Sequence, residues 1–129
     1  MIPFLDLKET NMPYQSEIEE AVLRVVRSGW YILGDQVKSF ERAYAQYCGT
    51  ANCIGVGNGL DAISLILKSY KELGVLKDGD EVLVPANTYI ASILAVSSSG
   101  LVPVLVEPDI NTYNIDPEKI GDKVTSRTK

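Results

Sequence analysis

The chain has 129 residues, enough for one domain of ordinary size, and its 46% hydrophobic and 22% charged residues are typical of a soluble globular protein. Its net charge of −5 argues against a nucleic-acid partner, because neutralising phosphates requires clustered lysine and arginine. The chain contains no histidine, so it lacks the commonest general base and metal ligand, and we expect no metal site.

The hydropathy pattern and the cysteines bear on location. No segment reaches the ~20 apolar residues that a membrane span needs. The N-terminus MIPFLDLKE carries an early acidic residue and no long apolar run, so we expect no signal peptide. Cys48 and Cys53 show no pairing pattern, and we interpret them as reduced, buried thiols. These features predict a cytoplasmic protein without a membrane partner.

The first 50 residues are expected to form an N-terminal arm followed by helices. Residues 1–14 contain two prolines and are interpreted as an extended arm. Residues 15–28 place apolar side chains on one helical face, with Ser16 as the N-cap and Glu19 three residues later. Gly29 is predicted to end this helix.

A second helix is predicted after SGWYILGD, a loop rich in large apolar residues. Its apolar stripe runs from Val37 to Tyr47 and ends near Cys48 and Gly49. After Gly49, short apolar runs typical of buried strands alternate with stretches of helical spacing. The first part of a larger domain is therefore expected over residues 51–129.

The expected order in residues 51–129 is strand, helix, strand, helix, strand, and then a short helix. The predicted strands and main helices cover residues 53–57, 60–73, 81–85, 88–99 and 101–108. Asp116 is the expected N-cap of the last helix, with Pro117 at its first position. Because the strands are continuously apolar, the fold class is α/β, a mainly parallel sheet with helices on both faces. Pro103 suggests that the last strand lies at a sheet edge.

Ligands of parallel sheets bind at the carboxyl ends of the strands, where two motifs stand out. The first, GNGLDA, joins the strand at 53–57 to a helix, and bare glycines there would let the helix's free N–H groups approach an anion. It matches neither the GxGxxG pattern nor a P-loop. The alternative is an ordinary strand-to-helix turn, with Asp61 as an acid in the first helical turn.

The second motif is PANTYIAS, after the strand at 81–85. Asn87 and Thr88 are candidate N-caps of the next helix. Tyr89 could stack on a flat ring beside a phosphate, and the alternative is that its side chain packs into the core.

Several stretches in order resemble a known family. They are SGWYILGDQVKSFE, GVGNGLDAI, DEVLVPANTYIASILAVSSSGLVPVLVEPD and the ending TYNIDPEKI. Together they resemble the N-terminal portion of the DegT/DnrJ/EryC1/StrS family of pyridoxal-phosphate (PLP)-dependent sugar aminotransferases. NGLDA and PANTYIAS are most similar to the branch that aminates nucleotide-linked 3-keto-6-deoxyhexoses. The resemblance implies part of the large domain of a fold-type I aminotransferase, with PLP as its cofactor.

The resemblance also implies cofactor-binding roles for particular residues. Gly59, Leu60 and Asp61 would present backbone N–H groups to the cofactor phosphate, and Asn58 would shape the turn. Tyr89 aligns with the aromatic residue that stacks on the pyridine ring.

The loop containing Trp30, Tyr31 and Gly34 aligns with one near the active site where two subunits meet, and we expect its residues to serve packing. A homodimer is the assembly that the resemblance implies. Asp6 and the arm would reach toward the substrate or the partner subunit.

The family's catalytic lysine, and the aspartate that pairs with the pyridine nitrogen, lie in later segments. None of the eight lysines in this sequence matches the catalytic motif, so no catalytic residue is assigned. We therefore interpret the chain as a truncated piece of a larger enzyme and expect it to be inactive by itself.

The function implied is transfer of an amino group, with L-glutamate as the expected donor, to a nucleotide-linked keto-deoxysugar for cell-surface polysaccharide or antibiotic sugar synthesis. One alternative is a PLP-dependent sugar dehydratase of the same family. Another is a non-catalytic assembly module that associates through its helices or open sheet edge. A dinucleotide-binding protein is disfavoured because GxGxxG is missing.

Overall fold

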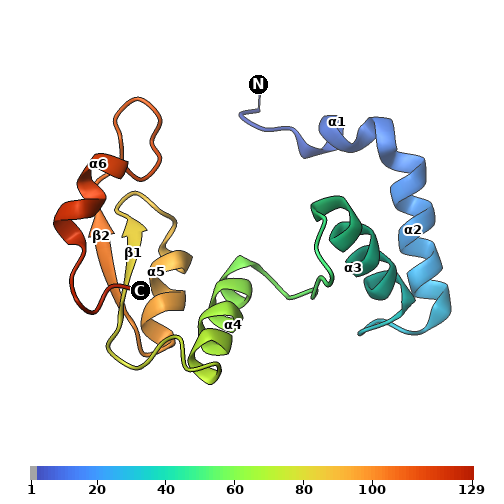
Figure 1. The fold of residues 1–129 in the computed structure, drawn as a ribbon. Helices are drawn as coiled ribbons and strands as arrows, with labels where there is room; N and C mark the ends of the chain where they lie inside the picture. The colour runs from blue at the N-terminus through green and yellow to red at the C-terminus, as the bar shows by residue number, and fades with distance from the viewer. Residues whose placement is uncertain (1–2) are drawn as a thin grey trace. The chain divides into compact units, whose positions relative to one another are not determined.

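The computed structural model describes residues 3–129, so the first two residues of the expected arm lie outside the described residues. The chain divides into two compact units, Met1–Gly55 and Val56–Lys129. Each unit is described here by itself (Figure 1). The division falls close to the boundary expected at residue 50, and the assignment of the two parts as domains stays a prediction.

The expected extended arm is wrong for most of its length. It forms the short helix α1 (Leu7–Asn11) and a 3₁₀ turn η1 (Met12–Tyr14), which lead directly into helix α2 (Gln15–Ser28). Pro13 does not interrupt these turns, because proline is tolerated at the start of a helical segment. Ser16 is therefore not an N-cap but lies inside the first turn of α2.

Glycines end both long helices of the first unit, as predicted. Helix α2 ends at Gly29 and helix α3 (Asp35–Cys48) ends at Gly49, each glycine in the left-handed conformation with φ of 67° and 68°. The side chain of Asp6 caps α1, where its Oδ1 accepts the N–H groups of Lys8 and Glu9. Its expected reach toward a substrate or a partner subunit stays a prediction.

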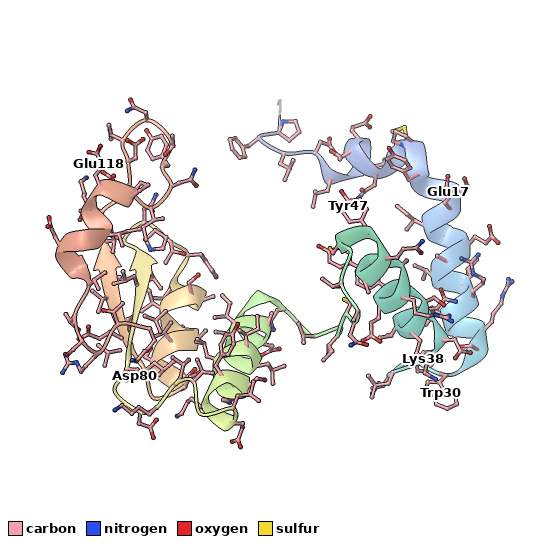
Figure 2. All side chains as sticks on the ribbon, viewed as in Figure 1. Glu17, Trp30, Lys38, Tyr47, Asp80 and Glu118 are labelled. Carbon is pink, nitrogen blue, oxygen red and sulfur yellow. The ribbon has the colours of Figure 1, made fainter. Side chains whose placement is uncertain are left out.

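The loop between α2 and α3 is held by its own side chains. Trp30 Nε1 donates to the carbonyl of Ile32 at 2.7 Å, and the Tyr31 hydroxyl donates to the carbonyl of Val26 at 3.2 Å. A Cβ at Gly34 would lie 3.2 Å from the Trp30 carbonyl oxygen, so this glycine permits close packing of the loop. Trp30, labelled in Figure 2, and Tyr31 are nevertheless exposed, so packing of these two rings does not occur within this chain.

The second unit holds a parallel sheet and most of the buried core. Strand β1 (Glu81–Pro85) pairs in parallel with strand β2 (Val102–Val106), with Glu81 opposite Val102 and Pro85 opposite Val106. Helix α5 (Ile90–Ser98) packs against both strands, and helix α4 (Gly59–Glu72) packs against α5, as Figure 1 shows. Their core cluster consists of Leu67, Leu76, Val84, Val96 and Leu101. Helical cover of the second sheet face stays a prediction.

The strand expected at residues 53–57 is wrong. No strand is assigned there, and the N–H of Gly55 donates to a carboxylate oxygen of Glu41 at 2.7 Å instead of to a neighbouring strand. A strand needs a paired edge, and no described segment offers one to these residues. The expectation that both cysteines are buried is also wrong, because Cys48 is exposed and Cys53 half-buried, each with a free thiol.

The other elements of the second unit agree with the sequence. Helix α4 covers nearly the expected residues, and both predicted strands at 81–85 and 101–108 are present. Helix α6 (Pro117–Ile120) begins at the predicted N-cap Asp116, whose Oδ1 accepts the N–H of Glu118, and the 3₁₀ turn η2 (Gly121–Lys123) follows it.

Lys71 joins the carboxyl ends of the two packed helices. Its ammonium donates to Asp78 Oδ1 and, at 2.9 Å, to the carbonyl of Ser99. Gly100 lies directly beside this pair with a φ of 77°, and a Cβ there would approach Asp78 Oδ1 to 2.3 Å. Gly100 therefore satisfies two constraints, a left-handed backbone and a close approach.

Alanine substitutions separate these two constraints. Gly74 has a similar φ of 73° with open space around it, whereas Gly121 has a φ of −54° and is also open. We expect Gly74→Ala to cost about 1 kcal/mol of folding stability and Gly100→Ala about 2 kcal/mol, since only the latter also displaces the Lys71 pair. Gly121→Ala should be neutral or slightly stabilising. Denaturant unfolding of the full-length protein measures the series, and equal losses at positions 74 and 100 would show that the close approach contributes nothing.

A buried carboxylate fixes the start of β1. Glu81 accepts hydrogen bonds from Thr125 Oγ1, from Arg127 Nε at 3.0 Å and from Arg127 Nη2. The Thr125 hydroxyl, followed by the Arg127 guanidinium, lowers the pKa of Glu81 below its ordinary value of 4.5. The backbone of Glu81 also pairs with residues 127–129, forming a parallel bridge to Thr128.

This lowered pKa predicts a pH dependence of stability. The folded-state pKa lies below the unfolded one, so the contribution of Glu81 is present above pH 4.5 and is lost as the pH falls through the folded value. The melting temperature of Glu81→Gln should therefore fall less steeply on acidification than that of the parent protein. Thr125→Val, which removes the first donor, should lie between them. Parallel acid profiles for all three proteins would contradict the assignment.

Candidate functional site

The start of α4 leaves backbone donors free. Asn58 is its N-cap, and Asn58 Oδ1 accepts the N–H of Asp61 at 2.9 Å. Within the described residues no acceptor faces the N–H groups of Gly59 and Leu60. Asn58 thus shapes the turn, and two of the three N–H groups singled out by sequence remain available, because the cap engages that of Asp61.

The glycines of this turn are not required by backbone conformation. Gly57 and Gly59 have no positive φ. A Cβ at Gly57 would lie 2.9 Å from Asp61 Oδ2, which also accepts a hydrogen bond from Asn58 Nδ2 at 3.0 Å. A Cβ at Gly59 would meet no described atom within 4 Å. Gly59 therefore keeps open a space that the described residues do not fill.

The start of α5 is bare in a similar way. Tyr89 is its N-cap residue without a side-chain cap, so the expectation that Asn87 or Thr88 caps this helix is wrong. Thr88 donates its hydroxyl hydrogen to Ser92 Oγ at 3.0 Å instead. Tyr89 lies at the helix start as expected, and its ring is 79% exposed, so it does not pack into a core within this chain.

The two helix starts border one hollow of about 500 Å³. Both motifs contribute to its walls, which consist of Asn58, Gly59, Leu60, Ile63, Tyr89, Ile90, Ala91, Ser92 and Leu94. No charged side chain lines it in the described chain. A negatively charged group there would be favoured by free N–H groups and the positive ends of two helix dipoles. An apolar wall with a few convergent polar groups is the usual composition of a small-molecule site.

A hollow of about 540 Å³ in the first unit offers less to a ligand. It lies along α3 and includes Asp35, Lys38, Glu41 and Arg42. Its charges are engaged locally, since Lys38 pairs with Asp35 and Glu41 accepts the N–H of Gly55. We therefore take the hollow between α4 and α5 as the candidate site.

A loop after β2 contacts the turn before α5, which the sequence gave no signal to find. Asn87 Nδ2 donates to the carbonyl of Tyr113 at 2.9 Å, across 26 residues of sequence. Asp109 Oδ1 accepts the backbone N–H groups of Thr112 and Asn111, and these hydrogen bonds lower the pKa of Asp109.

Among residues 3–129, no helix combines the length and apolar character needed to cross a membrane. No group of three or more metal-ligating side chains in that range is placed to hold a metal ion.

The family model described as "DegT/DnrJ/EryC1/StrS aminotransferase family" matches residues 13–129. A dTDP-3-amino-3,6-dideoxy-alpha-D-galactopyranose transaminase of Aneurinibacillus thermoaerophilus is 65% identical over 129 residues, which are 100% of this chain and 34% of that protein.

Solved structures show the same likeness. The structure of S. venezuelae DesV in complex with a ketimine intermediate has a TM-score of 0.85 and 43% identity, over 99% of this chain and 33% of that one. A GDP-4-keto-6-deoxymannose-3-dehydratase with a trapped PLP-glutamate geminal diamine has a TM-score of 0.78 and 32% identity, over 86% of this chain and 29% of that one. The chain spans about a third of the length of the relatives it matches. The chain belongs to the DegT/DnrJ/EryC1/StrS aminotransferase family.

Proposed function

We propose that these 129 residues form the cofactor-phosphate-binding part of a PLP-dependent sugar aminotransferase. The observation that carries the proposal is the meeting of two bare helix starts and an exposed tyrosine at one hollow. The family, and the 65% identity to a dTDP-sugar transaminase, support the reaction class.

The donor set fits a phosphate. Gly59 and Leu60 offer unpaired N–H groups at the positive end of a 14-residue helix. The missing Cβ of Gly59 leaves room for the ligand to approach the backbone. Asp61 would contribute through its N–H only by sharing it with Asn58. We propose Gly59, Leu60 and Asp61 as the phosphate-binding residues.

Tyr89 supplies the flat surface on which the pyridine ring of PLP would stack. Its ring is exposed at the mouth of the same hollow, where an aromatic side chain can stack on a pyridine ring. When bound, PLP supplies the electron sink for amino-group transfer. The residues of this chain would hold the phosphate, orient the ring and exclude water from one of its faces.

The substrates and the assembly are further parts of the proposal. The relative's name supports a nucleotide-linked keto-deoxysugar as the amino acceptor. L-Glutamate is the proposed amino donor, supported by the PLP-glutamate adduct named for the dehydratase structure. We propose a homodimer in the cytoplasm.

The lysine that binds the cofactor covalently is proposed to lie outside these residues. No lysine lines the hollow in the described chain. Lys71 is held at the opposite, carboxyl-terminal end of α4 by Asp78 and the Ser99 carbonyl. None of the eight lysines is therefore assigned a catalytic role.

A sugar dehydratase is the second candidate, favoured by the likeness to the dehydratase structure. The two reactions are distinguished by their products. A transaminase yields an amino sugar and consumes one amino donor per turnover, whereas a dehydratase releases water and leaves the sugar without a new nitrogen.

Borohydride reduction of the full-length protein with PLP tests the assignment of the lysine. We expect one cofactor per chain, attached at a lysine outside residues 1–129, because no lysine here reaches the hollow. Peptide mapping by mass spectrometry locates the adduct, and incubation with a keto-sugar nucleotide and L-glutamate shows whether an amino sugar forms. A stoichiometric adduct on Lys71 or another lysine of this segment would overturn the assignment.

Proline at position 59 tests the phosphate cradle. Gly59 is the first residue of α4 and follows the extended Asn58, so Gly59→Pro should keep the helix while removing one free N–H. We expect PLP affinity to fall about 10- to 100-fold, the value of one hydrogen bond to a charged group. Gly59→Ala keeps the N–H and should weaken binding less. The measurement is PLP titration by absorbance, with circular dichroism as the control for helix content, and equal losses in both variants would exclude the N–H as the determinant.

A further inference from the structure

We infer that Asn87 is a positioning residue, which holds the turn carrying Tyr89 at the mouth of the hollow by anchoring the loop after β2. The expected effect of Asn87 on cofactor binding rests on the proposed function. The hydrogen-bonded link between the turn and the loop does not. The proposal depends on three observations: the side-chain bridge, the build of the loop that receives it, and the lack of other restraints on Tyr89.

The bridge joins the carboxyl ends of the two paired strands. Asn87 follows β1 by two residues, and Tyr113 lies in the loop after β2. Asn87 Nδ2 donates to the Tyr113 carbonyl at 2.9 Å, a normal hydrogen-bond length. Because the strands are parallel, both segments emerge at the same edge of the sheet, where ligands of such sheets bind.

The receiving loop is built to present that carbonyl. The N–H of Tyr113 donates to the Asp109 carbonyl at 2.8 Å, and the N–H of Asp109 donates to the Asn114 carbonyl at 2.9 Å. Tyr113 has a φ of 58°, a left-handed conformation that a non-glycine residue adopts at a cost of about 1–2 kcal/mol. The loop is also closed at its base by an antiparallel bridge between Pro108 and Ile115. Because its own hydrogen bonds hold this loop in place, it can fix the position of a side chain that binds to it.

Tyr89 has few other restraints. It begins α5 without a side-chain cap, and its ring is 79% exposed. The turn before it is held by the Thr88 N–H, which donates to the Pro85 carbonyl at 3.1 Å, and by the Ala86 N–H, which donates to Val106. Asn87 lies between these two contacts, so its side-chain bridge is what ties the middle of the turn to the anchored loop.

The sequence predicts Asn87 as a helix cap, but in the structure its side chain bridges to Tyr113 instead. An N-cap would act on the first turn of α5 alone. A bridge to Tyr113 couples the position of Tyr89 to the loop after β2, so a disturbance of either segment is transmitted to the other.

Hydrogen–deuterium exchange of the full-length protein tests the link itself. Asn87→Ala removes the bridge, and Asn87→Asp keeps the shape but replaces the amide donor with a charged carboxylate, which cannot donate to the Tyr113 carbonyl. Both should speed amide exchange in residues 86–92 and also in residues 108–116. Asn114→Ala is the matched control, because Asn114 is exposed and its hydrogen bonds among the described residues come from its backbone alone. Faster exchange confined to residues 108–116 would overturn the inference.

PLP binding tests the consequence for the ligand. Loss of one neutral hydrogen bond should weaken PLP affinity about 3- to 10-fold in Asn87→Ala. If Asn87 acts through Tyr89, the double variant Asn87→Ala/Tyr89→Ala should bind no more weakly than Tyr89→Ala alone. Independent, additive losses would overturn the inference. If the parent protein binds no PLP, the proposed function fails. Hydrogen–deuterium exchange in residues 86–92 of the Asn87 variants then still supports or overturns the link between the turn and the loop.

Discussion

The parallel pairing of β1 with β2 is the constraint on which the site depends. The two strands run in register from Glu81–Val102 to Pro85–Val106, and the N–H of Ala86 continues the ladder to the Val106 carbonyl. This pairing brings the segment after each strand to one edge of the sheet. Helix α5 is the crossover between the strands, so its first residue and the turn before it lie at that edge.

The hollow between α4 and α5 would attract an anion although no charged side chain lines it in the described chain. Asn58 engages one N–H of the first turn of α4 and leaves two, and α5 starts without any side-chain cap. An anion would therefore be bound by fixed backbone dipoles, whose orientation costs no side-chain ordering. Lys71 lies at the other end of α4, where it donates to Asp78 and to the Ser99 carbonyl beside Gly100. The two ends of α4 thus differ: the N-terminal end has free N–H groups, whereas the C-terminal end is engaged in contacts within the fold.

The two units differ in how they are stabilised. The second unit buries a continuous apolar cluster around Leu67, Val96 and Leu101. In the first unit, among the described residues, Ala45 is the buried hydrophobic residue, while the apolar faces of α2 and α3 remain exposed. Its helices are defined by local devices instead, namely glycine ends at positions 29 and 49 and the hydrogen bonds of Trp30 and Tyr31. Local devices specify where a helix begins and ends, but burial supplies most of the stability of a fold.

The sequence by itself determined the elements whose signals are local. Helical spacing in residues 60–73, continuous apolar runs at 81–85 and 101–108, and an Asp-Pro helix start at 116–117 all depend on near neighbours, and the structure contains each of them. The motifs around Gly59 and Tyr89 were also visible, because bare turns after strands are local features. Their assignment as ligand-binding residues remains a prediction.

Only the tertiary structure decided the rest. Residues 53–57 have the composition of a strand, but a strand forms only with a paired edge, and the Gly55 N–H pairs with Glu41 instead. The N-terminal residues look extended because proline disfavours helix interiors, yet Pro13 lies where a helical segment starts. Asn87 resembles a helix cap until its partner 26 residues away is known. In each case the deciding contact lies outside the local pattern, so spacing and propensity could not reveal it.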